Sequence, residues 1–96
     1  MPDFEWDESK NASNFEKHGI SFDEVTDIFD DPNRLQEIQR RGGERRWKTI
    51  GAVLSVVLTV VYTTRENLIR LISARAASRK ERSDYINNEN KSSKNL

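Results

Sequence analysis

A glutamate and two basic residues recur at every second position of one candidate strand. Glu44, Arg46 and Lys48 would therefore project from the same face of a β-strand. In the apolar segment that follows, the even-numbered positions are predicted to face the core, which leaves Arg65 on the exposed side. If Trp47 faces the core, Arg65 shares one surface with the other three residues. A single bulge would reverse this assignment, because it shifts later side chains to the other face.

This set of side chains suits the cleavage of a phosphodiester. When RNA is cut by attack of its own 2′-hydroxyl, the reaction needs a base, an acid and positive groups beside the phosphorane oxygens. Glu44 is the candidate base, and Arg46 and Arg65 are candidates to bind the phosphate and stabilise the transition state. Lys17 and His18 are candidates for the acid or for substrate contact. The alternatives are an exposed Glu44–Arg46 ion pair that contributes little and a histidine that interacts only with its helix dipole.

Basic residues continue from these strands into the last predicted helix. The candidate RNA-binding residues are Lys48, Arg70, Arg75, Arg79 and Arg82. Arg70, Arg75, Arg79, Lys80 and Arg82 form a basic segment from the last strand into the last helix, which favours a surface for the nucleic-acid backbone. Arg75 is also a candidate transition-state stabiliser. The alternative is a solvated helix face that binds nothing.

Charge is divided unevenly along a chain whose formal net charge is zero. Residues 1–33 hold ten acidic and two basic residues, whereas residues 34–82 hold twelve basic and four acidic ones. Ten of those twelve bases are arginine, whose planar fork binds phosphate in a bidentate manner. The split favours a polyanion or an acidic partner on one side of the molecule. The alternative is that the two halves pair with each other across the fold.

Several chemistries are excluded by what the sequence lacks. There is no cysteine, so disulfides, thiolate metal sites and thiol nucleophiles are ruled out. A single histidine provides no zinc site, and the acids that follow Asp23 lack the spacing of a calcium-binding loop. Gly42 and Gly43 form a predicted turn, since the lysine and hydroxyl residue of a phosphate-binding loop are missing. We therefore expect no metal and no other cofactor.

The 96 residues suffice for one small domain. Strands are predicted near residues 4–6, 35–40, 45–50, 56–63 and 68–73, with helices at 7–17 and 22–31 and from residue 78 onward. The order β-α-α-β-β-β-β-α, with short turns between the later strands, predicts an α+β fold in which helices pack on one face of an antiparallel sheet. The domain is expected to span residues 1–86, and the polar residues 87–96 to form a disordered tail.

Helix starts are signalled twice by a capping box, a serine followed three residues later by glutamate. The first is Ser21 with Glu24, and the second is Ser78 with Glu81. The boundary between the second and third long strands is not predicted, because residues 52–55 lack the usual turn types. The longest apolar-rich run has 11 residues, too few to span a membrane, and the acidic N-terminus is unlike a signal peptide. We therefore expect a cytoplasmic protein without membrane contact.

The motifs, taken in order, resemble the BrnT family of ribonuclease toxins from bacterial type II toxin–antitoxin systems. The matching segments are Phe4-x-Trp6-Asp7-x-x-Lys10, Asn14-x-x-Lys17-His18-Gly19-Ile20-Ser21-Phe22, Gly43-Glu44-x-Arg46, Ile50-Gly51, Val60-Val61-Tyr62-Thr63-x-Arg65, Ile69-Arg70-x-Ile72-Ser73-Ala74-Arg75 and Ala77-Ser78-x-x-Glu81-Arg82-x-x-Tyr85. Each segment alone is weak, but together they cover nearly all of the predicted folded part.

The resemblance implies a RelE-like α+β fold and an endoribonuclease that cleaves RNA without a metal and arrests translation and growth. It also implies a cognate BrnA-type antitoxin with a ribbon-helix-helix DNA-binding domain, which neutralises the toxin. Operator DNA would be bound only through the complex of the two proteins. The alternative functions are a non-catalytic module that binds RNA or operator DNA and a protein-interaction module that acts only within a complex.

Overall fold

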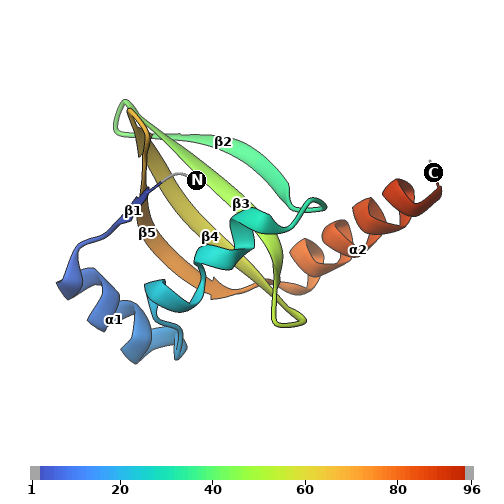
Figure 1. Cartoon of the computed structure of the whole chain (residues 1–96), viewed down its shortest axis with the longest axis horizontal. Coiled ribbons are helices and arrows are strands. Elements are labelled where there is room, and N and C mark those ends of the chain that lie inside the picture. The colour runs from blue at the N-terminus through green and yellow to red at the C-terminus, as the bar shows by residue number, and fades with distance from the viewer. Residues whose placement is uncertain (1–2, 95–96) are drawn as a thin grey trace.

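The computed structural model describes the backbone of residues 3–94 and the side chains of residues 3–40 and 42–88 (Figure 1). The elements in chain order are β1 (Asp3–Glu5), α1 (Glu8–His18), the 3₁₀ helices η1 (Phe22–Glu24) and η2 (Thr26–Asp30), β2 (Leu35–Arg41), β3 (Glu44–Val53), β4 (Val56–Arg65), β5 (Leu68–Ala76) and α2 (Arg79–Lys94). The predicted α+β class is confirmed. Residues 87–94, predicted as part of a polar tail, continue α2, and residues 95–96 lie outside the described part.

The five strands form one mixed sheet in the order β1-β5-β4-β3-β2. Strands β2 to β5 are antiparallel neighbours joined by short turns, as predicted. The prediction of a purely antiparallel sheet is wrong, because β1 pairs with β5 in parallel. Short turns dictate direction only between consecutive strands, and more than half of the chain separates β1 from β5.

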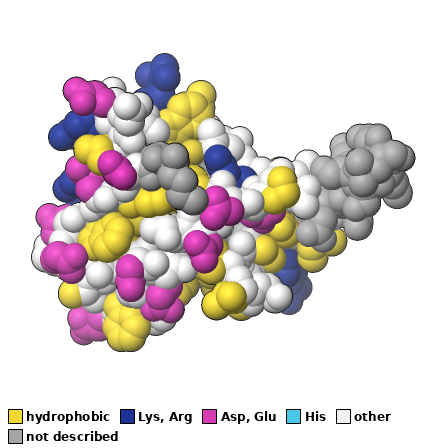
Figure 2. All heavy atoms as spheres, viewed as in Figure 1, with side chains coloured by type: hydrophobic (Ala, Val, Ile, Leu, Met, Phe, Trp, Pro, Cys, Tyr) yellow, Lys and Arg dark blue, Asp and Glu magenta, His cyan; other side chains and the backbone are white. Residues whose placement is uncertain are grey.

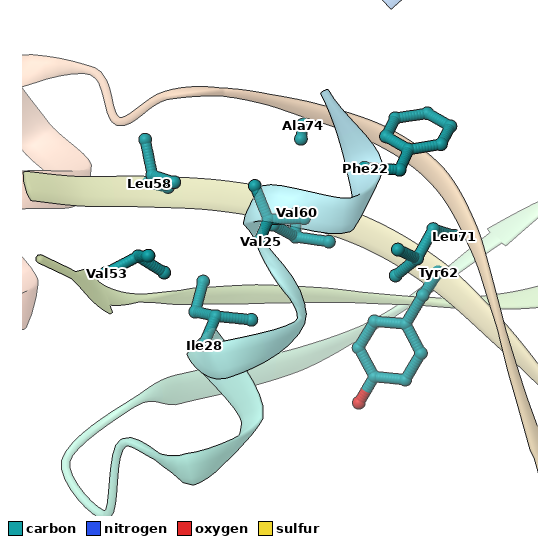
Figure 3. Packing of buried hydrophobic residues seen from close by; sticks show 9 residues of the cluster. All are labelled: Phe22, Val25, Ile28, Val53, Leu58, Val60, Tyr62, Leu71 and Ala74. Atoms are coloured by element: carbon teal, nitrogen blue, oxygen red, sulfur yellow. The ribbon is translucent and has the colours of Figure 1, made fainter. Parts of the chain in front are cut away.

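The core lies between the sheet and the two 3₁₀ helices (Figure 3). Phe22, Val25 and Ile28 are fully buried and pack against strand residues such as Val60 and Leu71. These three apolar residues recur every three positions, which matches the three-residue turn of a 3₁₀ helix and keeps them on one face. The prediction of one α-helix over residues 22–31 is therefore wrong. The hydroxyl of Ser21 donates to the carboxylates of Asp23 and Glu24 and does not cap the backbone.

The first helix lies beside the edge of the sheet. The Asp7 side chain caps its N-terminus by accepting from Ser9 N and Lys10 N, and Gly19 ends it with a φ of 70°. Within the helix, the buried Asn14 donates to the carbonyl of Ala74 over 2.8 Å and accepts from the Ala74 amide over 3.0 Å. The Asn14 side chain therefore pairs with the edge of β5 as a neighbouring strand would.

The last helix begins on the face of the sheet opposite η1 and η2, so the prediction that all helices pack on one face is wrong. Its predicted capping box is confirmed: Ser78 Oγ accepts from Glu81 N, and Glu81 Oε1 accepts from Ser78 N. Further along α2, the hydroxyl of Tyr85 donates to Asp31 over 2.6 Å. The α+β sheet is therefore covered on one face by the 3₁₀ helices and, at one end of the other face, by α2.

Strands β3 and β4 are joined by a two-residue turn, Leu54–Ser55, with φ values of 49° and 69°. Two successive positive φ angles are typical of a type I′ hairpin turn, in which asparagine and glycine are the favoured residues. This turn contains neither, which is why the sequence does not reveal it.

Candidate nucleic-acid interface

The sheet face that points away from Phe22, Val25 and Ile28 is called the open face. The strand register determines which side chains lie on it, since directly paired residues project to the same side. Glu37 pairs with Lys48, Lys48 with Val61, and Thr59 with Arg75. By the same alternation the described polar and charged strand residues on the open face are Asp3, Glu5, Glu37, Gln39, Glu44, Arg46, Lys48, Thr59, Thr63, Arg65, Arg70, Ser73 and Arg75.

A bulge in β5 brings two arginines to this face. Val61 pairs with Ser73 and Tyr62 with Leu71, so Ile72 has no partner in β4. Arg70 and Arg75 are five positions apart and would point to opposite sides of a regular strand. With the extra residue between them, both lie on the open face. The bulge is in β5, so the alternation along β3 and β4 that relates Glu44, Arg46, Lys48 and Arg65 is unbroken.

The opposite side of the molecule is acidic. Figure 2 shows the side covered by the 3₁₀ helices, where Asp and Glu side chains predominate over Lys and Arg. Asp23, Glu24 and Asp27 belong to this side and are exposed. The charge division along the sequence thus becomes, in the fold, an acidic side and an open face rich in cations.

One end of the open face, the α2 end, lies under the start of α2 and centres on Glu81. This glutamate is 8% exposed. Its carboxylate accepts from Arg75 over 2.7 and 3.0 Å, from Lys48 over 3.2 Å and from the hydroxyl of Thr59 over 3.0 Å. The hydrogen bond from the Arg75 guanidinium holds the pKa of Glu81 far below its usual range. Burial opposes this shift, while Ser78 N, Thr59 and Lys48 add to it.

Lys48 links the α2 end to the neighbouring strand. Its ammonium lies 2.9 Å from a carboxylate oxygen of Glu37 and 3.2 Å from one of Glu81. The hydrogen bond to Glu37, together with that to Glu81, raises the pKa of Lys48 despite its burial. Lys48 and Arg75, both predicted to bind RNA, are therefore already paired with acids.

The other end of the open face, the turn end, lies near the β2–β3 and β4–β5 turns. There Glu44 and Arg46 are 3.6 Å apart, and their side chains are 51% and 27% exposed. The Nε of Arg46 is buried and has no hydrogen-bond partner in the described part of the chain. Thr63 Oγ1 donates to the carbonyl of Arg45 over 3.0 Å, and Arg65, two residues further along β4, projects to the same face as Thr63. The turn end therefore combines a carboxylate and two arginines that are only weakly paired.

At the β1 edge of the open face, next to Thr63 of β4, Arg70 donates to Glu5 over 2.6 Å. Arg70, a predicted RNA-binding residue, therefore lies on the open face with its charge compensated by Glu5. The remaining predicted RNA-binding residues, Arg79 and Arg82, lie exposed on α2, and neither forms an ion pair with another described residue. Lys80 on the same helix is paired with Asp84 over 3.1 Å.

Lys17 and His18 are not brought together with the turn end. They are exposed at the end of α1, where they line a shallow depression of about 190 Å³ together with Ser73. Ser73 is aligned with Lys48 through Val61, so two strand spacings, about 10 Å, separate β5 from β3. Glu44 lies four residues further along β3, and it therefore does not share a single phosphate with His18.

Sequence reasoning missed the second role of Glu81, which caps α2 and also binds Arg75, Lys48 and Thr59. The only signal was its place in the capping box, which does not indicate long-range partners. Thr59 could have been singled out, since it is a hydroxyl residue within an apolar run of the sequence. The structure buries it to 1% exposure. No group of three or more His, Cys, Asp or Glu side chains suited to a metal occurs among the described residues.

A model of one protein family matches residues 6–81, from the first tryptophan to the central glutamate of the α2 end. Its description is the ribonuclease toxin BrnT of type II toxin–antitoxin systems. The chain belongs to the BrnT toxin family. The match spans both ends of the open face, so Glu44, Arg46, Arg65 and Glu81 lie within the matched region. No curated protein matches the chain. Within residues 3–94 no helix is long and apolar enough to cross a membrane.

Proposed function

We propose that the chain is an endoribonuclease toxin with a RelE-like fold, which cleaves RNA without a metal and thereby arrests translation and growth. Membership of the BrnT family supports ribonuclease activity and an antitoxin partner. We propose further that a BrnA-type antitoxin with a ribbon-helix-helix domain neutralises the toxin in the cytoplasm. Operator DNA is then bound only by the complex of the two proteins.

The observation that carries this proposal is the turn end of the open face. There a carboxylate, Glu44, lies 3.6 Å from a guanidinium whose Nε has no acceptor among the described residues. The Arg46 side chain is 27% exposed and only weakly paired, so its guanidinium can donate to a phosphate oxygen. A surface that only binds RNA gains little from a carboxylate among its arginines.

In the proposed reaction the Glu44 carboxylate takes the proton of the 2′-hydroxyl, and the 2′-oxygen attacks the phosphorus. Arg46 and Arg65 stabilise the negative charge on the phosphorane oxygens. The 5′-oxygen leaves and gains a proton from water, so the products are a 2′,3′-cyclic phosphate and a 5′-hydroxyl. Lys17 and His18 contact the RNA chain beyond the scissile phosphate, because they lie across β5 from the turn end.

The proposal is tested with the purified chain and an end-labelled RNA in excess EDTA. We expect cleavage products that end in a 2′,3′-cyclic phosphate. Arg46→Ala should reduce the cleavage rate by about 100-fold, since removing one donor to a developing oxyanion costs this much or more. Arg45→Ala is the matched control: Arg45 is exposed on the same strand and points to the opposite face. It should cleave at the wild-type rate.

Two results would contradict the proposal. Equal losses in the Arg45 and Arg46 variants would show that the arginines act only through net charge. Salt-dependent RNA binding without cleavage, in buffer with EDTA and with ribosomes added, would favour a non-catalytic binding module. Growth arrest on expression, lost in Arg46→Ala and kept in Arg45→Ala, is the corresponding measurement in cells.

A further inference from the structure

An apolar groove lies at the β3–β4 turn, on the acidic side of the molecule. It has a volume of about 380 Å³, and its apolar lining includes Val25, Val53, Leu58, the turn residue Leu54 and the first residue of β4, Val56. Leu54 is 93% exposed and Val56 is 51% exposed. Both side chains are therefore available to a partner, and neither is needed to fill the core.

The turn itself is held in a backbone conformation that a leucine rarely adopts. Leu54 has a φ of 49°, and Ser55 follows with a φ of 69°. A left-handed conformation is unfavourable for a residue with a branched side chain, and asparagine or glycine would make the same turn with less strain. The strained Leu54 contributes almost no burial to the folded chain, so its side chain is better explained by an intermolecular contact.

The rim of the groove is acidic and uncompensated. Asp23, Glu24 and Asp27 line it. None of the three forms an ion pair with any other described side chain, and the Ser21 hydroxyl is the partner that Asp23 and Glu24 share. Three carboxylates around an apolar floor repel phosphate and attract cations. The groove is therefore unsuited to RNA and complementary to a cationic protein segment.

We propose that this groove is the docking site for a cationic, amphipathic segment of the antitoxin. Aliphatic side chains of that segment pack on Leu54 and Val56, while its lysines or arginines pair with Asp23, Glu24 and Asp27. The inference rests on the proposed function, which supplies the antitoxin as the partner. The groove and the turn end of the open face lie at opposite ends of strands β3 and β4, so docking and RNA cleavage can be altered separately.

The decisive variant is Leu54→Asn, studied with the purified antitoxin encoded with this chain. Asparagine tolerates a positive φ and removes the apolar side chain, so stability and binding should change in opposite directions. We expect Tm to rise while the antitoxin Kd increases at least tenfold and the rate of RNA cleavage stays unchanged. Ile38→Asn is the matched control, because Ile38 is 54% exposed on the outer strand β2. Its antitoxin Kd should remain at the wild-type value.

A second variant tests the acidic rim. Asp23→Asn combined with Asp27→Asn keeps the shape of both side chains and removes two charges. We expect a weaker complex whose Kd depends less on salt concentration than that of the wild type. Titration calorimetry at two salt concentrations gives both quantities.

The inference would be overturned by an unchanged antitoxin Kd in Leu54→Asn, by a lowered Tm in that variant, or by an antitoxin that does not bind the wild-type chain. It would also be overturned if sedimentation showed a wild-type homodimer that Leu54→Asn dissociates while antitoxin binding persists, since the groove would then bind a second copy. Absence of RNA cleavage by the wild type would contradict the proposed function alone, because antitoxin binding is measured without RNA.

Discussion

The two ends of the open face contain the same residue types but differ in how their charges are paired. At the α2 end the nearly buried Glu81 binds Arg75 and Lys48 at distances of 2.7 to 3.2 Å. At the turn end Glu44 and Arg46 are 3.6 Å apart, and both side chains are partly exposed. Side-chain identity alone therefore does not reveal which charges are already paired, whereas burial and the number of unsatisfied donors do.

The comparison also assigns different roles to arginines that look equivalent in the sequence. Arg75 uses two guanidinium nitrogens on Glu81, so few of its donors remain for RNA. Arg46 has an unpaired Nε and a distant carboxylate. The α2 end should therefore affect mainly stability, and the turn end mainly catalysis.

The largest effect is expected for Glu81→Ala. The substitution removes the shared acceptor of Arg75, Lys48 and Thr59 and leaves a partly buried lysine with one acid partner. We expect the free energy of unfolding to fall by about 3 kcal/mol, near the lower bound for breaking a buried pair, because Arg75 can rehydrate. Urea denaturation measures the change. Glu37→Ala is the control, since Glu37 is exposed and its loss should cost less than about 1 kcal/mol. Equal losses in the free energy of unfolding for the two variants would contradict the central role assigned to Glu81.

Glu44→Gln is expected to have the next largest effect, on catalysis. The amide cannot accept the 2′-hydroxyl proton, and loss of a general base reduces rates by at least about 100-fold. The same exposed side chain contributes little to folding, so the free energy of unfolding should change by less than about 0.5 kcal/mol. Single-turnover cleavage and urea denaturation of one preparation separate the two quantities. A full rate in folded Glu44→Gln would remove Glu44 from the mechanism.

Much of the sheet could be predicted from the sequence, because its signals are local. Alternation of apolar and polar residues placed strands β2 to β5, and Gly19 and the Ser78–Glu81 pair marked helix ends that the structure retains. The same alternation predicted that Glu44, Arg46 and Arg65 share one face of the sheet, since the bulge lies in β5 and not in β3 or β4. These features depend on neighbours a few positions apart, which a single sequence displays directly.

Other features depend on contacts between distant residues. The parallel pairing of β1, the bulge at Ile72 and the convergence of Lys48, Arg75 and Glu81 have no local signature. The 3₁₀ helices had one, the three-residue spacing of Phe22, Val25 and Ile28, but it also fits part of an α-helical face. The distance between His18 and Glu44 depends on where α1 meets the sheet, so spacing along the chain could not reveal it.

Acidification should produce a smaller effect, centred on the α2 end. Hydrogen bonds from Arg75 and its neighbours lower the pKa of Glu81. Burial alone would raise the pKa of Asp31, but donors that include Tyr85 and Ala52 N lower it. A carboxylate with a lowered folded-state pKa stabilises the fold above its unfolded-state pKa of about 4, and this contribution is lost as the pH falls.

We therefore expect the free energy of unfolding to decrease by roughly 1–2 kcal/mol between pH 6 and pH 3. Glu81→Gln should flatten this dependence, whereas Glu44→Gln should leave it unchanged because Glu44 is exposed. Urea denaturation at several pH values provides the comparison. A wild-type curve that is flat down to pH 3, or that is flattened equally by both variants, would contradict the contrast between the two ends.

The smallest effect is expected for the exposed cations of α2. Arg79 and Arg82 have no ion-pair partner among the described side chains, whereas Lys80 lies 3.1 Å from Asp84. If the unpaired arginines neutralise RNA phosphates, each alanine substitution should lower the slope of log K against log salt by about 0.7. Lys80→Ala should change it less, because Asp84 already compensates the lysine. Binding of a single-stranded RNA by cleavage-deficient Glu44→Gln, titrated at four salt concentrations, measures the slopes. A larger decrease of this slope in Lys80→Ala than in Arg82→Ala would show that ion pairing within α2 does not determine which cations bind the RNA.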